Sequence, residues 1–185
     1  MTVRLSLVAP AMSTALREAR FDDSGPVEPL PEGLLTVAAG VRVVGSPSGR
    51  CRATAEALGL AHAVPVDALA GCAMGRWRGR SLAELAAGEP ESLGAWLSDP
   101  DAAPHGGESL RELRERVGAW LDALESGAYL AVAEPDVIRA AAAHALDAPA
   151  GAFWRLDVRP LSRTELSGRS GRWNLRLGGP LRAAG

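Results

Sequence analysis

Short apolar runs that alternate with helical segments constrain the fold of this chain more than any other feature. Three runs have the length and composition of buried strands, and helical segments follow the second and the third. The runs are Val3–Val8, Val41–Gly45 and Tyr129–Ala133, and the helical segments are Gly49–Leu58 and Asp136–Leu146. This alternation predicts an α/β fold, a three-layer α/β/α sandwich around a mainly parallel central sheet.

Two Ser-x-x-Glu segments predict further helix starts, because this spacing forms a capping box. They pair Ser81 with Glu84 and Ser109 with Glu112. Apolar residues recur at helical spacing after the second segment and predict an amphipathic helix. Its apolar stripe consists of Leu110, Leu113, Val117, Trp120, Leu121 and Leu124.

The remaining segments predict a loop and a small β region. Asp22–Glu32 is rich in proline, glycine and acidic residues, which favours a loop. Arg155–Leu177 alternates well enough for two or three short strands around a turn at Gly168–Gly171. With 185 residues and no internal repeat, we expect one domain over residues 1–185.

Composition excludes several classes of partner. The formal net charge is −2, which favours neither nucleic acid nor an anionic membrane surface as a partner. All basic side chains other than histidine are arginine, and Asn174 is the single asparagine in a chain without lysine or glutamine. This usage is typical of a GC-rich genome, such as an actinobacterial one.

The cysteines and the first residues favour a cytoplasmic protein. Cys51 and Cys72 provide neither a disulfide framework nor metal-ligand spacing, so a reducing compartment is the simplest expectation. Met1–Ala11 lacks the basic start and the long apolar core of a signal peptide. No apolar stretch is long enough to span a bilayer, and no histidine spacing suits a metal, so we expect no metal and no cofactor.

The topology of α/β sheets predicts where a ligand would bind. In such sheets the crevice lies beyond the carboxyl ends of the strands. Here those ends lead into Ala9–Met12, Ser46–Arg52 and Glu134–Asp136. We therefore expect these three segments to form the functional site.

Several segments, in this order, resemble motifs of the histidine phosphatase superfamily, the phosphoglycerate mutase-like family. Ser46–Arg50, followed by Ala53–Glu56, is similar to its Ser-Pro-x-x-Arg…Gln-Thr-Ala-Glu segment. Gly75–Gly79 is similar to its Gly-x-Trp-x-Gly, and Pro104–Ser109 to its Pro-x-Gly-Glu-Ser stretch. The strand and helix of Leu130–Ala140 resemble its second catalytic segment. The resemblance implies a phosphoglycerate mutase-like fold over nearly the whole chain.

The chain departs from the family at the residues that carry its chemistry. The first strand of the family ends in Arg-His-Gly, in which the His is the nucleophile. The corresponding residues here are Ala9, Pro10 and Ala11. The second catalytic His corresponds to Glu134. The resemblance therefore implies a degenerate member that lacks both catalytic histidines.

The other catalytic groups of the family are reduced as well. The acid that protonates the leaving group would fall in Leu69–Met74, which contains no carboxylate, and Ala53 replaces a Gln. Arg50 remains, and we expect it to pair with Glu134 in the former anion site. We therefore predict that the chain neither binds phosphate strongly nor hydrolyses phosphomonoesters by the family mechanism.

Three functions remain open at this point. The chain could be a non-catalytic member that binds a small molecule or a partner. It could instead be a repurposed enzyme of isomerase, cyclase or lyase type on a non-phosphorylated molecule, with Glu134 as acid/base, Arg50 orienting the substrate and His105 assisting. Residual phosphatase activity through another nucleophile is the third hypothesis.

The candidate site combines these residues into a crevice that should be more apolar than in the family, which suits a small-molecule ligand. Glu134, Arg50 and His105 are the candidate catalytic residues. The candidate binding residues are Ala9, Pro10, Met12, Ser13, Cys72 and Trp77. The family often dimerises, which implies a homodimer.

Structural roles compete with these assignments. Glu134 could serve only as the partner of Arg50, and His105 could be a solvated loop residue. Ser13 could cap a short helical segment over residues 14–20, and Trp77 could line the mouth of the pocket. We expect the remaining tryptophans to serve in packing: Trp96, Trp120, Trp154 and Trp173.

Overall fold

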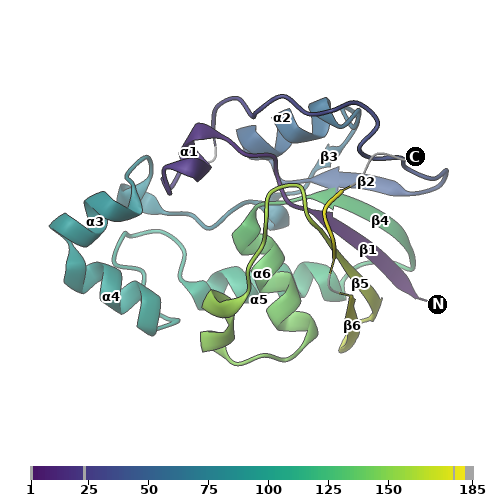
Figure 1. The fold of residues 1–185 in the computed structure, drawn as a ribbon. Helices are drawn as coiled ribbons and strands as arrows, with labels where there is room; N and C mark the ends of the chain where they lie inside the picture. Colours follow the sequence, from purple (N-terminus) through teal and green to yellow (C-terminus); the bar gives the residue numbers. More distant parts are fainter. Residues whose placement is uncertain (1, 23, 177, 182–185) are drawn as a thin grey trace.

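The computed structural model describes residues 2–22, 24–176 and 178–181. A six-stranded sheet with the strand order β3-β2-β4-β1-β5-β6 forms its centre (Figure 1). The first four strands of the chain are parallel to one another, whereas β5 is antiparallel to β1 and β6 to β5. The strands are β1 (Val3–Val8), β2 (Arg42–Gly45), β3 (Val64–Pro65), β4 (Gly127–Val132), β5 (Arg163–Arg169) and β6 (Arg172–Arg176).

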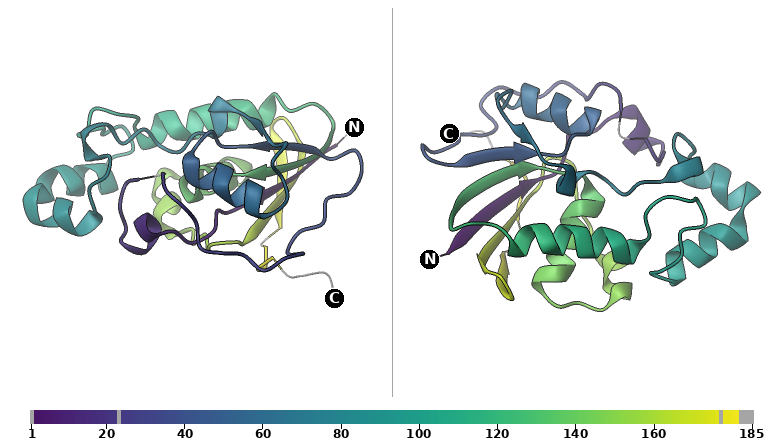
Figure 2. Two further views of the ribbon diagram at one scale, coloured as in Figure 1. Left: turned by 90° about the horizontal axis from the view of Figure 1, so that it is seen from above. Right: turned by 180° about the vertical axis from the view of Figure 1, so that it is seen from behind.

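Helices cover both faces of this sheet. The α-helices are α1 (Thr14–Arg17), α2 (Gly49–Ala57), α3 (Leu82–Gly88), α4 (Pro90–Ser98), α5 (Leu110–Asp122) and α6 (Pro135–Ala145). Short 3-10 helices span η1 (Asp67–Leu69), η2 (Gly75–Trp77) and η3 (Ala150–Arg155). Figure 1 and Figure 2 show α2 on one side of the sheet and α5 and α6 on the other. The predicted three-layer α/β/α architecture is therefore confirmed.

The alternation of side chains along the central strands produces two separate cores. In β4, Tyr129 and Ala131 pack with α5 and α6, whereas Leu130 and Val132 pack with α2. Successive side chains of a strand point to opposite faces, and helices cover both faces. Both sets of positions must therefore be apolar, which explains the nearly continuous apolar runs of the sequence.

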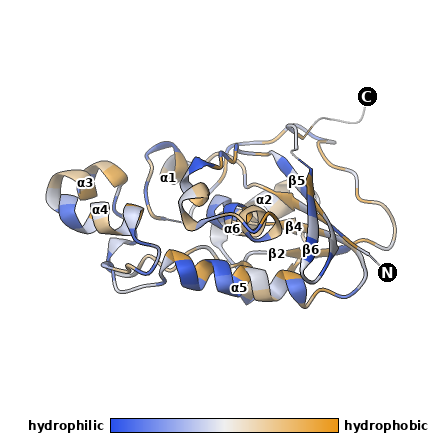
Figure 3. Cartoon of the chain, turned by 90° about the horizontal axis from the view of Figure 1, so that it is seen from below, coloured by the Kyte–Doolittle hydropathy of each residue, from blue (hydrophilic) through white to orange (hydrophobic). Residues whose placement is uncertain are grey.

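Both predicted capping boxes are present. The Ser81 side chain accepts a hydrogen bond from the backbone N–H of Glu84 at the start of α3, and the Ser109 side chain accepts one from Glu112 at the start of α5. The acidic side chains reach back to the N–H of the capping serines. Hydrophilic and hydrophobic segments alternate along α5 in Figure 3, as expected for an amphipathic helix.

Helices α3 and α4 project from the sheet (Figure 1). Together with η2 they form a small core of their own. This core, the tryptophan cluster, consists of Trp77, Leu85, Leu93 and Trp96. The sequence analysis predicts no helix over α4 and no strand at β3. Pro90 occupies the first turn of α4, where its missing N–H costs nothing.

Predicted boundaries agree with the observed elements to within two residues for β1, β2, β4, α2 and α6. The tail holds two strands and not three among its described residues, and Leu177 lies outside the described residues. Residues 22 and 24–32 contribute no helix or strand, and Asp23 of the predicted loop also lies outside the described residues. No helix in the described part of the chain is long and apolar enough to cross a membrane.

Candidate functional site

The carboxyl ends of three parallel strands meet at one edge of the sheet. Val8 and Gly45 both pair with Val132, so β1, β2 and β4 end side by side. Backbone hydrogen bonds continue the ladder by one residue, from Ala133 N–H to Val8 O at 3.0 Å and from Ser46 N–H to Val132 O at 2.8 Å. The three segments predicted to form the site therefore leave the sheet next to one another.

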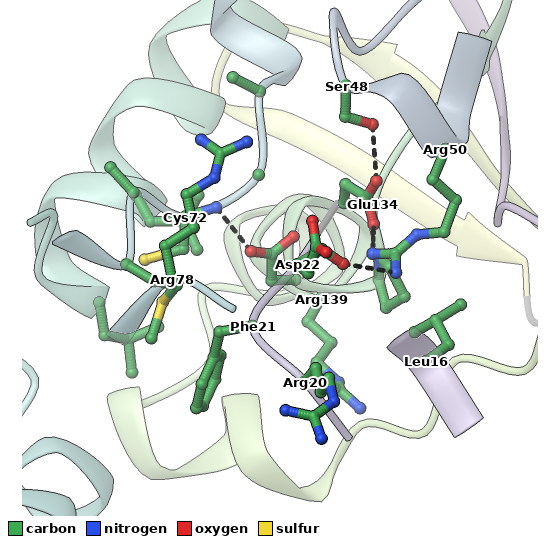
Figure 4. A pocket seen from close by; sticks show the side chains of 18 of the residues that line it. Leu16, Arg20, Phe21, Asp22, Ser48, Arg50, Cys72, Arg78, Glu134 and Arg139 are labelled. Carbon is green, nitrogen blue, oxygen red and sulfur yellow. Dashed lines mark hydrogen bonds and ion pairs between the residues drawn. The ribbon is translucent and has the colours of Figure 1, made fainter. Parts of the chain in front are cut away.

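Arg50 and Glu134 form a buried ion pair at this edge (Figure 4). Their side chains are only 7% and 3% exposed. Ser48 Oγ donates a hydrogen bond to the other carboxylate oxygen of Glu134 at 2.7 Å, and the Cys51 thiol lies 3.4 Å from the same oxygen. Arg50 Nη1 donates to the carbonyl oxygen of Asp22 at 3.0 Å. The ion pair expected from the sequence is thus present, with partners on both sides.

The loop after β1 is closed and apolar. Ala9 and Ala11 have no exposed surface. The N–H of Ala11 donates to Thr54 Oγ1 at 3.0 Å, and that hydroxyl donates to the Arg50 carbonyl at 2.9 Å. Ser13 Oγ accepts a hydrogen bond from Leu16 N–H as the N-cap of α1, which is its predicted structural role. Thr54 therefore anchors this loop to α2.

A second carboxyl group, Asp136, lies beside Glu134. Asp136 accepts hydrogen bonds from the N–H of Cys72 at 2.7 Å and from the N–H of Val137 at 2.8 Å. Burial, and then the nearby charge of Glu134, raise the pKa of Asp136. Gly71 covers both carboxyls, because a Cβ at this position would lie 3.3 Å from Glu134 Cγ and 3.7 Å from Asp136 Oδ2.

A cavity of about 430 Å³ opens next to these groups. Arg50, Glu134 and Asp136 contribute to its polar wall, and the guanidinium-bearing residues Arg20 and Arg139 also line it. Figure 4 labels both side chains among those that line the cavity. Its large apolar lining residues are Leu16, Phe21, Met74, Trp96, Leu110, Leu113, Phe153 and Trp154. The volume and the lining are typical of a small-molecule site.

Only three of the predicted site residues line this cavity, namely Arg50, Cys72 and Glu134. The other six lie outside its lining: Ala9, Pro10, Met12, Ser13, Trp77 and His105. Conversely, Trp96 and Trp154, which the sequence analysis assigned to packing, contribute to the cavity wall. The pocket is therefore displaced from the end of β1 toward α4, α6 and η3.

Trp77 belongs to the tryptophan cluster instead, and the His105 ring packs against this cluster. The prediction of a solvated loop histidine is wrong, because His105 is 2% exposed and its ring lies 5.0 Å from that of Trp77. Its Nδ1 accepts the N–H of Gly107 at 3.0 Å, and its buried Nε2 has no hydrogen-bond partner among the described residues. Burial, and then the charge of Arg76, lower the pKa of His105.

The surroundings of the two thiols of this region favour their protonated form. Burial raises the pKa of both Cys51 and Cys72, and in each case a neighbouring carboxylate raises it further. Both cysteines are free. In the part of the chain that the structure describes, no group of three or more His, Cys, Asp or Glu side chains is arranged to hold a metal ion.

The sequence analysis missed Asp136 and Arg139 as site residues. Asp136 falls in one of the three predicted crevice segments, so its position was a usable indication. However, an acidic residue in the first turn of a helix is common for electrostatic reasons. Arg139 resembles any polar residue of an amphipathic helix, and only the packing of η3 against α6 brings it to the cavity.

Comparisons with known proteins agree with the fold and extend it. Residues 34–179 match the model of the histidine phosphatase superfamily, branch 1. The chain is 35% identical over 132 residues to the uncharacterized protein Mb2253c of Mycobacterium bovis and to the bifunctional protein Rv2228c of Mycobacterium tuberculosis. These matches cover 66% of this chain and 36% of each relative, so the chain spans about a third of their length.

Solved structures with the same fold include phosphatases. A mycobacterial glucosyl-3-phosphoglycerate phosphatase, Rv2419c, is 26% identical with a TM-score of 0.76, over 97% of this chain and all of that chain. Its complex with VO3 is 27% identical with a TM-score of 0.77, over 96% and 98% of the two chains. The alpha-ribazole phosphatase from Shigella flexneri, at 19% identity, shares the fold with a TM-score of 0.80 over 98% of both chains.

Proposed function

Because the chain belongs to the histidine phosphatase superfamily, we propose that it uses the family's fold to bind a small organic molecule and does not form a phosphohistidine. The Arg50–Glu134 ion pair is the observation that carries this proposal. The resemblance assigns Arg50 to phosphate binding and position 134 to a catalytic histidine. Here the Glu134 carboxylate forms an ion pair with Arg50, the cation that a phosphate would need.

The resemblance places Pro10 at the position of the family's nucleophile, and this supports the absence of the covalent step. A phosphohistidine requires an imidazole nitrogen that attacks phosphorus and later releases the phosphoryl group to water. Pro10 has neither an imidazole nor a backbone N–H. Ser13 is engaged as a helix cap, and His105 is buried against the tryptophan cluster outside the cavity lining. These positions therefore support the absence of the family mechanism.

Electrostatics oppose phosphate binding as well. A carboxylate about 4 Å from a phosphate oxygen repels it by roughly 4 kcal/mol at an effective dielectric constant near 20. This corresponds to about a thousandfold loss of affinity. Opening the Arg50–Glu134 pair to admit phosphate would also leave a buried carboxylate without its cation, which costs further free energy.

Hydrolysis of a generic aryl phosphate, assayed from acidic to neutral pH, tests this proposal. We expect no turnover above that of the Arg50→Ala variant, because Arg50 is the residue to which the resemblance assigns phosphate binding. Turnover that Arg50→Ala abolishes would show an active phosphatase. The triple variant Ala9→Arg, Pro10→His, Glu134→His should gain vanadate binding, and a folded triple variant without that gain would show that the site is misplaced.

One observation favours a second candidate, a repurposed enzyme that uses Glu134 as acid/base on a non-phosphorylated molecule. Ser48 Oγ lies 2.7 Å from Glu134 Oε1, within the range of a nucleophile and its base, and Arg50 orients the carboxylate from the other side. Under this alternative, Ser48→Ala and Glu134→Gln abolish turnover of a non-phosphorylated substrate equally. Under the binding proposal, ligand is recovered unchanged after prolonged incubation.

A further inference from the structure

Asp136 and Arg139 lie one turn apart on α6 and line the same cavity, yet neither forms an ion pair with another described residue. We propose that the cavity binds a zwitterionic amino acid with an apolar side chain, whose ammonium group contacts Asp136 and whose carboxylate contacts Arg139. This inference rests on the proposed binding function and names the chemical class of the ligand.

Asp136 is one of three carboxyl-bearing residues that line the cavity, together with Asp22 and Glu134. Its oxygens accept two backbone N–H groups, and no described residue forms an ion pair with it. Arg116 influences it from beyond ion-pair distance and is itself paired with Glu108 at 2.7 Å. Glu134, by contrast, has Arg50. Asp136 is therefore the carboxyl group beside the Arg50–Glu134 pair that is available to the ammonium group of a ligand.

Arg139 is the complementary case among the guanidinium groups of the cavity. Its Nε donates to the carbonyl of Leu156 at 2.7 Å, and its guanidinium lies 6.0 Å from the centre of the Phe153 ring. No carboxylate in the described part of the chain forms an ion pair with it. Arg20, by comparison, is paired with Glu18 and Glu84. A ligand carboxylate can thus bind Arg139 without displacing an internal partner.

The spacing of Asp136 and Arg139 fits a ligand whose ammonium and carboxylate groups are attached to the same carbon atom. Residues three apart on a helix have Cβ atoms about 5–6 Å from each other. No ion pair joins Asp136 and Arg139 in the described part of the chain, and both line the cavity, so the two charged groups of an α-amino acid can approach them from the cavity. A ligand with a single charge would leave the other group unpaired, and a doubly charged anion would face Asp136 and Glu134.

The rest of the cavity suits an apolar side chain. Trp96, Phe153 and Trp154 form a continuous aromatic wall, with ring centroids 4.6 Å apart for Trp96 and Trp154 and 4.9 Å apart for Phe153 and Trp154. Leu110 and Leu113 of α5 add aliphatic surface. Aromatic surface also attracts ammonium groups. An aromatic or aliphatic amino acid therefore satisfies both the charged and the apolar parts of the lining.

Calorimetric titration of the unaltered protein tests this inference. The probes are L-tryptophan, L-phenylalanine and L-leucine, together with tryptamine, which lacks the carboxylate, and indolepropionate, which lacks the ammonium group. We expect at least one amino acid to bind, and the best one to bind at least about tenfold more tightly than its analogue with one charge removed. Absence of binding by all three amino acids at millimolar concentration overturns the inference.

Two variants assign the contacts, with matched controls at exposed positions. Asp136→Asn should weaken binding of the amino acid but leave that of indolepropionate unchanged, and Arg139→Gln should leave that of tryptamine unchanged. The controls are Asp157→Asn and Arg159→Gln, whose native side chains are 78% and 85% exposed. They should change no affinity. Equal losses for all probes would indicate general disruption of the cavity and would contradict the assigned contacts.

The outcomes also separate this inference from the proposed function. If tryptamine or indolepropionate binds as tightly as L-tryptophan, the zwitterion assignment is wrong, whereas binding of an organic ligand stands. If orthovanadate binds and the protein hydrolyses aryl phosphate while no amino acid binds, both proposals are wrong.

Discussion

The segments after β1 and β4 leave the same edge of the sheet but have opposite character. The loop after β1 is closed, with Ala9 and Ala11 fully buried and the Ala11 N–H bonded to Thr54. The segment after β4 places two carboxyls at a cavity, Glu134 as the N-cap of α6 and Asp136 in its first turn. The residues after β1 thus pack in the interior, whereas those after β4 carry the charged groups. The difference teaches that a shared sheet edge fixes where a site can form, not which strand end supplies its chemistry.

Removing the Glu134 charge from the segment after β4 should have the largest effect on stability. Glu134→Gln leaves the buried Arg50 guanidinium without its anion, and we expect a loss of about 3–5 kcal/mol in the free energy of unfolding. Chemical denaturation measures it. The double variant Arg50→Met, Glu134→Leu should lose less than the single variant, because no buried charge remains unpaired. A double variant less stable than Glu134→Gln would show that the charges are not what makes the site sensitive.

Removing the hydrogen bond that anchors the loop after β1 should have an intermediate effect on stability. Thr54→Val removes the acceptor of the buried Ala11 N–H, and an unsatisfied buried donor costs about 1–3 kcal/mol. Thr54→Ser, which keeps the hydroxyl, is the matched control and should retain most of the stability. If the two variants unfold at the same denaturant concentration, the hydrogen bond does not hold the β1 loop.

The smallest effect should come from Asp136 and should depend on pH. Burial raises the pKa of Asp136 above its unfolded value, so its contribution to stability is full below the unfolded pKa, near 3.9, and is lost as the pH rises through the folded pKa. Asp136→Asn should therefore gain stability relative to the unaltered protein as the pH rises. Thermal unfolding across pH 3–7 measures the difference, and a difference independent of pH would contradict the raised pKa.

The tryptophan cluster extends the comparison to a third region. Because the pKa of His105 is lowered in the folded protein, the stability that this residue contributes is present above its unfolded pKa, near 6.5, and declines as the pH falls through the folded pKa. His105→Gln should reduce this part of the decline. An unchanged pH dependence in His105→Gln would assign the decline to other groups.

The sequence predicts most of the fold because its elements depend on local patterns. Each of these patterns lies within a few consecutive residues. The apolar runs predict β1, β2 and β4, and the capping boxes at Ser81 and Ser109 predict the starts of two helices. Helix α4 and the two-residue strand β3 are not predicted, because neither has a sequence pattern of its own. Their positions depend on the tryptophan cluster and on pairing with β2.

The sequence predicts the candidate site less completely, because long-range packing selects which residues face the cavity. Arg50 and Glu134 are predictable from the ends of β2 and β4. His105 and Trp77 are not, because a close contact binds their loops together. Gly75 has φ +47°, and a Cβ there would lie 2.1 Å from the His105 carbonyl oxygen. The contact holds Trp77 and His105 next to each other, and neither of them lines the cavity.

A crystal structure of the unaltered protein soaked with orthovanadate tests the central claim most directly. The account predicts that Arg50 and Glu134 remain paired and that no oxyanion binds between residues 10 and 134. Vanadate bound at Arg50, with the Glu134 side chain displaced, would contradict it.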